Sequence, residues 1–235
     1  MEKSSITEIR DRFDKDVERF SNLQTGQQST IDADISLELL TEAAKRIQSK
    51  PGNLLDIGCG AGNYTLKMLS KLPGMICTLI DLSKPMLDRT YERVLKASAK
   101  EVKIIQGDIR QRDLQPNHYY IMFAVAVLHH LRDDADWKFV FAKLFGALAS
   151  GGCLMISDLV TQDTEVLNNY IQEKYGDYLE EIGGAAYKDK VMAYIDKEDS
   201  PRSLNYQMDL MKEVGFKNVE ILHKNKCFAA FCGIK

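Results

Sequence analysis

The sequence predicts an α/β protein with a doubly wound, seven-stranded sheet that is mostly parallel, ends in a C-terminal antiparallel hairpin and carries helices on both faces. Three observations predict this fold class. The chain has 235 residues, 45% hydrophobic and 28% charged, which is enough for one substantial core. Short apolar runs alternate with amphipathic stretches between residues 53 and 157. The last two apolar runs are separated by a very short linker.

The first helix is expected over residues 35–47, where apolar side chains recur at helical spacing before Pro51 and Gly52 interrupt the pattern. The alternation that follows predicts parallel strands, because an intervening helix lets the next strand run in the same direction. Strands are expected at residues 53–57, 75–80, 102–106, 119–126 and 153–157, with helices at 63–72, 84–98 and 134–148.

The pattern changes after the fifth strand. Residues 159–200 are polar, rich in tyrosine and acid, and are expected to form helices without a new parallel strand. Ser200 followed by Pro201 predicts a helix start, and Gly215 predicts its end. The final two strands must pair as antiparallel neighbours, since their linker is too short for a parallel crossover; they cover residues 219–223 and 227–231.

Composition and charge exclude several function classes. The net charge of -3 and the pI of about 5.9 give no basic surface, so nucleic acid is not expected as a partner. No apolar run approaches the roughly 20 residues of a membrane span and the start of the chain is charged, so no membrane partner is expected and the predicted location is cytoplasmic. Five widely spaced cysteines favour buried free thiols over a disulfide framework or a zinc site.

A glycine-rich turn follows the first strand, in the stretch LLDIGCGAGNYT of residues 54–65. Such a turn can hold a triphosphate, a dinucleotide or S-adenosylmethionine. The triphosphate loop is excluded because Gly-Lys-Ser/Thr is missing after Gly62. The dinucleotide fingerprint is weakened, because it needs its third glycine at position 63, which is Asn63.

The string DIGCGAG resembles the first motif of the class I S-adenosylmethionine-dependent methyltransferases, a family with a Rossmann-like fold. The resemblance implies that the turn brings its backbone to the methionine part of S-adenosylmethionine, the expected cofactor. The cofactor-binding residues that it implies here are Asp56, Gly58, Cys59, Gly60 and Gly62.

The end of the second predicted strand matches the second motif of this family. Asp81 lies 25 residues beyond Asp56, and a carboxylate there can accept hydrogen bonds from both hydroxyls of a ribose. The resemblance also implies that Leu82 and Met86 flank the adenine.

Two further strand ends resemble the family. After the third strand, Asp108 in the string GDI is expected to accept a hydrogen bond from the adenine amino group, with Ile109 as an apolar wall. After the fourth strand comes AVLHHL. Val125 stands where many relatives have a small polar residue, which leaves a cofactor contact to a backbone group or to nothing.

The candidate catalytic residues are His129 and His130, which follow the fourth strand at its carboxyl end. Methyl transfer from a sulfonium depends mainly on positioning and desolvation, and a base is needed only when the acceptor must lose a proton. Structural roles in loop positioning or capping stay open for both histidines. Arg19 is a candidate for the cofactor carboxylate, or forms a surface ion pair. Asp158 is a candidate to bind substrate or a metal, or acts as a cap. No motif predicts a metal.

Residues 1–235 are expected to form a single domain in which residues 1–30 are a lid segment and residues 159–200 are a helical insertion that caps the substrate. Arg202, with Lys226 and Phe228, is a candidate to face an acidic substrate group, or is a solvated residue. Five tyrosines of the insertion are candidates to line a pocket, or are packing residues; they are Tyr170, Tyr175, Tyr178, Tyr187 and Tyr194.

The predicted function is S-adenosylmethionine-dependent methyl transfer to a small-molecule acceptor that the sequence does not identify. One alternative is an enzyme related to tRNA-nucleoside modification, or to carboxy-S-adenosylmethionine synthase, which is similar in the early Phe13-Asp14 segment and in the terminal hairpin. A non-catalytic protein that binds the cofactor is another, and an NAD-dependent oxidoreductase is disfavoured by the position of Gly62. A homodimer stays open.

Overall fold

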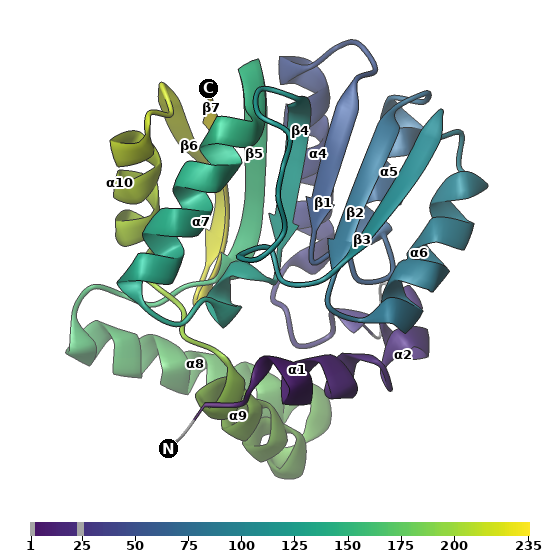
Figure 1. Cartoon of the computed structure of the whole chain (residues 1–235). Coiled ribbons are helices and arrows are strands. Elements are labelled where there is room, and N and C mark those ends of the chain that lie inside the picture. The colour runs from purple at the N-terminus through teal and green to yellow at the C-terminus, as the bar shows by residue number, and fades with distance from the viewer. Residues whose placement is uncertain (1–2, 23–25) are drawn as a thin grey trace.

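The computed structural model describes residues 3–22 and 26–235, and its centre is one sheet with helices on both faces (Figure 1). Seven strands lie in the order β3-β2-β1-β4-β5-β7-β6. The first five pair in parallel, whereas β7 is antiparallel to both of its neighbours. The predicted fold class is therefore confirmed. The strands are β1 (Asn53–Ile57), β2 (Ile76–Asp81), β3 (Glu101–Gln106), β4 (Tyr119–Val125), β5 (Leu148–Leu159), β6 (Asn218–Asn225) and β7 (Phe228–Ile234).

The sheet separates two hydrophobic cores. Because side chains alternate along a strand, Leu54 joins the core under α4, α5 and α6, while the next residue, Leu55, joins the core under α7 and α10. Both residues are fully buried. The helices are α4 (Ala33–Ile47), α5 (Asn63–Lys71), α6 (Lys84–Leu95), α7 (Asp134–Ala147) and α10 (Leu204–Val214).

The start of α10 differs from the sequence prediction. The helix begins at Leu204, and its N-cap is Ser203, whose hydroxyl accepts a hydrogen bond from the Tyr206 N–H at 3.1 Å. The prediction that Ser200 caps it was wrong, because the Ser200 N–H donates instead to the carbonyl of His129 at 2.6 Å. This bond holds the chain before α10 against the loop that follows β4.

The insertion forms two helices that lie at one edge of the sheet together with α1, below the strands in Figure 1. Tyr175 is buried with Leu159 and Cys227, which fixes the first of these helices to the ends of β5 and β7. The Tyr175 hydroxyl also donates a hydrogen bond to the carbonyl of Ser29 at 2.8 Å. These helices are α8 (Glu165–Gly183) and α9 (Ala185–Glu198), and the N-terminal ones are α1 (Ile6–Phe13) and α2 (Val17–Ser21).

The N-terminal segment is fastened to the end of α9. The Ser4 N–H donates to the carbonyl of Lys197 at 3.0 Å. The Arg132 guanidinium donates to the carbonyl of Glu198 at 2.5 Å and to that of Ser4 at 2.7 Å. One arginine thus links the start of the chain to the end of the insertion.

The cysteines are all buried and unpaired, which confirms the prediction of free thiols; they are Cys59, Cys77, Cys153, Cys227 and Cys232. Within the part of the chain that the structure describes, no helix combines the length and the apolar character that crossing a membrane requires.

Candidate active site

A cavity of about 630 Å³ lies at the carboxyl ends of β1, β2, β4 and β5. In doubly wound sheets this edge is where ligands bind. The walls come from the glycine turn and the loops after these strands on one side, and from α1, α9 and the segment after α2 on the other. Its size is that of pockets that enclose a small organic ligand.

The glycine turn has the backbone geometry that its sequence requires. Gly58 and Gly60 have φ angles of 63° and 49°, a region that side-chain-bearing residues rarely adopt. A Cβ on Gly58 would lie 2.6 Å from Cγ2 of Val127, whereas a Cβ on Gly60 would meet no described atom within 4 Å. The open space at Gly60 lets a ligand approach the backbone. Gly62 is the N-cap of α5 and does not appear among the described lining residues.

Asp56 lies buried beneath the turn. One of its carboxylate oxygens accepts a hydrogen bond from the Thr65 hydroxyl at 2.6 Å. Burial raises the pKa of Asp56 to about 7. The residue reaches the cavity wall together with Cys59, as the motif implied.

Asp81 is held in place by backbone donors. Its two oxygens each accept a hydrogen bond at 2.8 Å, from the N–H of Gly60 and from the N–H of Ser83. Each oxygen keeps a further lone pair for a ligand hydroxyl. Burial raises the pKa of Asp81 to about 6, so it is mostly ionised at neutral pH. Leu82 and Met86 line the cavity beside it.

Asp108 and Ile109 occupy other surroundings. The Asp108 carboxylate forms an ion pair with Arg110, at 2.6 Å from the guanidinium, and Ile109 is packed in the core under α7. Neither residue is found among the described lining residues of the cavity. In the present arrangement this carboxylate faces Arg110 and not the cavity.

Arg19 and Val125 do line the cavity. Arg19 pairs with Asp16 at 2.8 Å and stacks on the ring of Phe20 at 4.4 Å. This places a cation in the wall formed by the N-terminal segment. Val125 is the last residue of β4 and packs against the core under α4, α5 and α6.

His129 is clamped between two carboxylates. Its Nδ1 is hydrogen-bonded to Asp158, and its Nε2 lies 3.7 Å from an oxygen of Asp199. Asp158 also accepts from the backbone N–H groups of Leu128, His129 and Leu159 at 2.9, 3.1 and 2.8 Å. Burial disfavours the charged imidazole, but the charges of Asp158 and Asp199 outweigh it and raise the pKa of His129 to about 9.

His130 differs from its neighbour. Burial and the charge of His129 lower the pKa of His130, which is therefore neutral at pH 7. Neither ring nitrogen has a hydrogen-bond partner among the described residues, although Nδ1 lies 3.3 Å from Asp199. Its ring meets that of Phe13 edge to face at 6.1 Å between centroids.

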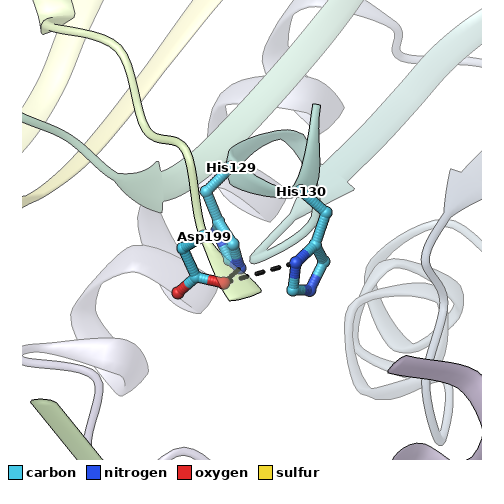
Figure 2. A group of neighbouring side chains, drawn as sticks. All are labelled: His129, His130 and Asp199. Carbon is cyan, nitrogen blue, oxygen red and sulfur yellow. Dashed lines mark ion pairs between the residues drawn. The ribbon is translucent and has the colours of Figure 1, made fainter. Parts of the chain in front are cut away.

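Asp199 is a site residue that the sequence reasoning missed. It is 4% exposed and lies next to both histidines, although 69 residues separate it from His130 (Figure 2). The only local signal is its place just before Ser200-Pro201: Pro201 disfavours a helical Ser200, so α9 ends here and Asp199 is its extended C-cap.

The insertion and the N-terminal segment close the cavity together. Arg12 forms an ion pair with Glu198 at 2.9 Å, donates to the Tyr194 hydroxyl at 2.6 Å and stacks on both the Phe13 and Tyr194 rings at 4.1 and 4.2 Å. Of the tyrosines singled out in the sequence, the lining residues include Tyr175, Tyr187 and Tyr194. Arg202 instead pairs with Asp134 at 2.9 Å.

Known proteins are similar to this chain in sequence. Residues 54–152 match the family model described as a methyltransferase domain. The chain is 27% identical over 207 residues to carboxy-S-adenosyl-L-methionine synthase of Chromohalobacter salexigens, covering 85% of this chain and 74% of that protein. It is also 27% identical over 220 residues to the enzyme of the same name from Wolinella succinogenes, covering 86% and 84%.

Solved structures share the fold. Phosphoethanolamine N-methyltransferase 2 of Haemonchus contortus, in complex with S-adenosyl-L-methionine, matches with a TM-score of 0.62 and 20% identity over 93% of this chain. Human N-acetylserotonin methyltransferase, also with S-adenosylmethionine, matches with a TM-score of 0.62 and 13% identity over 99% of this chain. The chain spans 46% and 59% of those two chains.

The sheet order, the ligand edge and the glycine turn define a Rossmann-like protein that binds its ligand at the carboxyl ends of the strands. Within that class, residues 54–152 match a methyltransferase domain, and this match together with the relatives and the solved structures supports a class I S-adenosylmethionine-dependent methyltransferase with S-adenosylmethionine as its cofactor. The open space at Gly60 and the free lone pairs of Asp81 fit this cofactor.

Proposed function

We propose that the protein transfers a methyl group from S-adenosylmethionine to a small-molecule acceptor. The observation that carries the proposal is that one cavity joins the glycine turn and Asp81 to the two histidines. The bound cofactor supplies an activated methyl group on a sulfonium. The chain supplies positioning and exclusion of water, which are the main requirements of such a displacement.

The proposed cofactor contacts follow the wall of the cavity. Asp81 accepts from the ribose hydroxyls, and Leu82 and Met86 lie along the adenine. The backbone of the glycine turn, from Gly58 to Gly62, faces the methionine part above Asp56, and Arg19 pairs with the cofactor carboxylate. We also propose contacts from Asp108, Ile109 and Val125; Asp108 and Ile109 lie outside the described lining, so both would have to move toward the adenine.

The acceptor end of the cavity holds the proposed catalytic residues, His129 and His130. His129 is an unsuitable base at neutral pH, because two carboxylates keep it charged. His130 is neutral and its nitrogens are free of hydrogen bonds within the described chain, so it is better suited to take a proton from the acceptor.

The size of the acceptor follows from what covers the site. We propose that residues 1–30 act as a lid and residues 159–200 as a substrate cap within one domain, since α1 and α9 supply walls of the cavity. An enclosed site favours a small molecule over a nucleic acid. Free, buried cysteines support the proposed cytoplasmic location. Assembly as a homodimer stays a proposal that sizing in solution tests.

A second candidate is modification of the cofactor itself. Two relatives named carboxy-S-adenosyl-L-methionine synthase favour it, because they cover most of this chain. A carboxylated cofactor needs a cation for its new carboxylate. Arg12, Lys15 and Lys190 line the cavity, and Arg12 is engaged by Glu198, so either lysine is the cation that this candidate would use.

One experiment separates these functions. The purified protein is incubated with S-adenosylmethionine labelled in the methyl group and with metabolite extract, and products are followed by mass spectrometry. Methyl transfer predicts S-adenosylhomocysteine and a labelled metabolite in equal amounts. A heavier, carboxylated cofactor supports the second candidate. If neither product forms while S-adenosylhomocysteine still binds, the protein is a non-catalytic binder and the proposal is overturned.

The same assay tests His130. We expect His130→Ala to lower turnover by about 100-fold, the lower range of general base catalysis, if the acceptor loses a proton. The control is His118→Ala, at the opposite end of β4 beside Asn53. Full turnover in both variants would remove the catalytic assignment while leaving the cofactor site intact.

A further inference from the structure

Three potential metal ligands meet at the acceptor end of the cavity. Nitrogens of His129 and His130 and an oxygen of Asp199 all lie within 4.8 Å of one another. Figure 2 shows both rings directed toward the same carboxylate oxygen. The histidines come from the short 3-10 helix after β4 (Leu128–His130), and the aspartate follows α9. The set of two imidazoles and one carboxylate is common in catalytic metal sites with open positions.

The spacing of these atoms fits ligands of one metal ion. The Asp199 oxygen lies 3.3 Å from His130 Nδ1 and 3.7 Å from His129 Nε2. Ligands at about 2.0–2.1 Å from a tetrahedral zinc ion are separated from one another by about 3.4 Å. The observed separations lie on either side of that value.

A carboxylate that would orient one of the histidine ligands is also present. His129 points Nε2 toward Asp199 and uses Nδ1 for Asp158, so its metal-facing nitrogen is fixed by a carboxylate behind it. Asp158 is itself fixed by three backbone N–H donors. A carboxylate–histidine pair of this kind sets the tautomer and orientation of a metal ligand.

Unpartnered buried atoms give independent support. The Asp199 oxygen that faces both histidines has no hydrogen-bond partner within the described chain, and neither nitrogen of His130 has one. Asp199 is 97% buried at its side chain. His129 Nε2 faces this oxygen from 3.7 Å without a hydrogen bond, and a bound cation would supply the direct bonds that the oxygen lacks.

We propose that His129, His130 and Asp199 bind one divalent transition-metal ion, with an open coordination position facing the cavity. The site would hold neutral imidazoles, so the proton on His129 leaves when the ion binds. An oxygen of the acceptor in the open position would lose its proton more readily, as water does on zinc.

This inference goes beyond the proposed function, which requires no metal. With an ion on Nδ1 of His130, the ring carries its proton on Nε2 and cannot accept another. The ion would then replace His130 as the group that prepares the acceptor. The sequence predicts no such site, because its ligands are not spaced as a local motif.

The test uses the full chain after removal of metals with a chelator. Zn²⁺ is titrated calorimetrically, and Co²⁺ is added as a spectroscopic probe. We expect one ion per chain and visible absorption typical of nitrogen and oxygen ligands. His130→Ala and Asp199→Asn each remove a proposed metal ligand. Loss of a residue that only hydrogen-bonds to a ligand weakens metal binding by roughly 10–100-fold, so these two variants should weaken Zn²⁺ binding by more than that. His118→Ala should bind like the original chain.

Binding of S-adenosylhomocysteine to each variant shows whether the fold is retained. The proposal is overturned if no stoichiometric ion binds, if the ligand variants bind as tightly as His118→Ala, or if cobalt shows thiolate bands from the cysteines. Methyl transfer that persists in the chelator-treated protein would uphold the proposed function while removing any role for the ion in it.

Discussion

The two ends of the cavity are built in opposite ways. At the cofactor end, Asp81 is fixed by backbone donors from Gly60 and Ser83, close to it in the chain or in the adjoining strand turn. At the acceptor end, Asp199 is brought to His130 from a segment 69 residues away, and one of its oxygens forms no hydrogen bond within the described chain. A shared ligand can be held by local motifs, whereas a particular acceptor is recognised by segments that differ from protein to protein.

The largest expected effect concerns the stability of the acceptor end. Asp158→Ala would leave three backbone N–H groups and a charged imidazole buried without their partner. We expect a loss of about 3–5 kcal/mol in the free energy of unfolding, measured by urea denaturation. The control Asp134→Ala removes an exposed ion pair with Arg202 and should cost less than about 1 kcal/mol. If Asp158→Ala and Asp134→Ala lost equal free energy of unfolding, Asp158 would not be what fixes His129.

A smaller effect is expected at the cofactor end. Asp81→Ala should weaken S-adenosylhomocysteine binding at least tenfold, because hydrogen bonds to a charged group contribute roughly 1.5–3 kcal/mol. The measurement is titration calorimetry, with Asp88→Ala as the control, since Asp88 pairs with Lys84 on the exposed side of α6. Unchanged affinity for Asp81→Ala would mean that the ribose lies elsewhere.

The smallest effect is a pH dependence of the same contact. The pKa of Asp81 is raised to about 6, so the carboxylate that accepts both ribose hydroxyls predominates above that pH and is lost below it. Affinity for S-adenosylhomocysteine should therefore fall about tenfold between pH 7 and pH 5. In Asp81→Asn this dependence should disappear. A rise in affinity on acidification would show that the protonated form binds.

Local patterns explain how much of this molecule is predictable. The order of strands and helices follows from apolar periodicity, and β1 matches its expected range of residues 53–57. β5 is longer than expected, because it starts at Leu148, where it pairs with Tyr119 ahead of the two glycines. Gly60 and Asp81 lie at the ends of neighbouring strands and line the cavity, a position that local patterns can predict, whereas their contacts with the cofactor stay predictions.

Long-range contacts explain what could not be predicted. Asp199 reaches the histidines only because the Ser200 N–H bonds to the His129 carbonyl, a pairing that no periodicity encodes. The ion pair of Asp108 with Arg110 likewise depends on Asp136 of α7, which holds the same guanidinium. Contacts of this kind join segments that are distant in the sequence, so they depend on tertiary structure and not on local patterns.

Arg132 has a consequence for the timing of turnover. Its guanidinium donates hydrogen bonds to the carbonyls of both Ser4 and Glu198, so the N-terminal segment and the insertion over the cavity are released or retained together. Loading and unloading would then be one cooperative event. Loss of the Arg132 guanidinium would leave each segment able to move without the other.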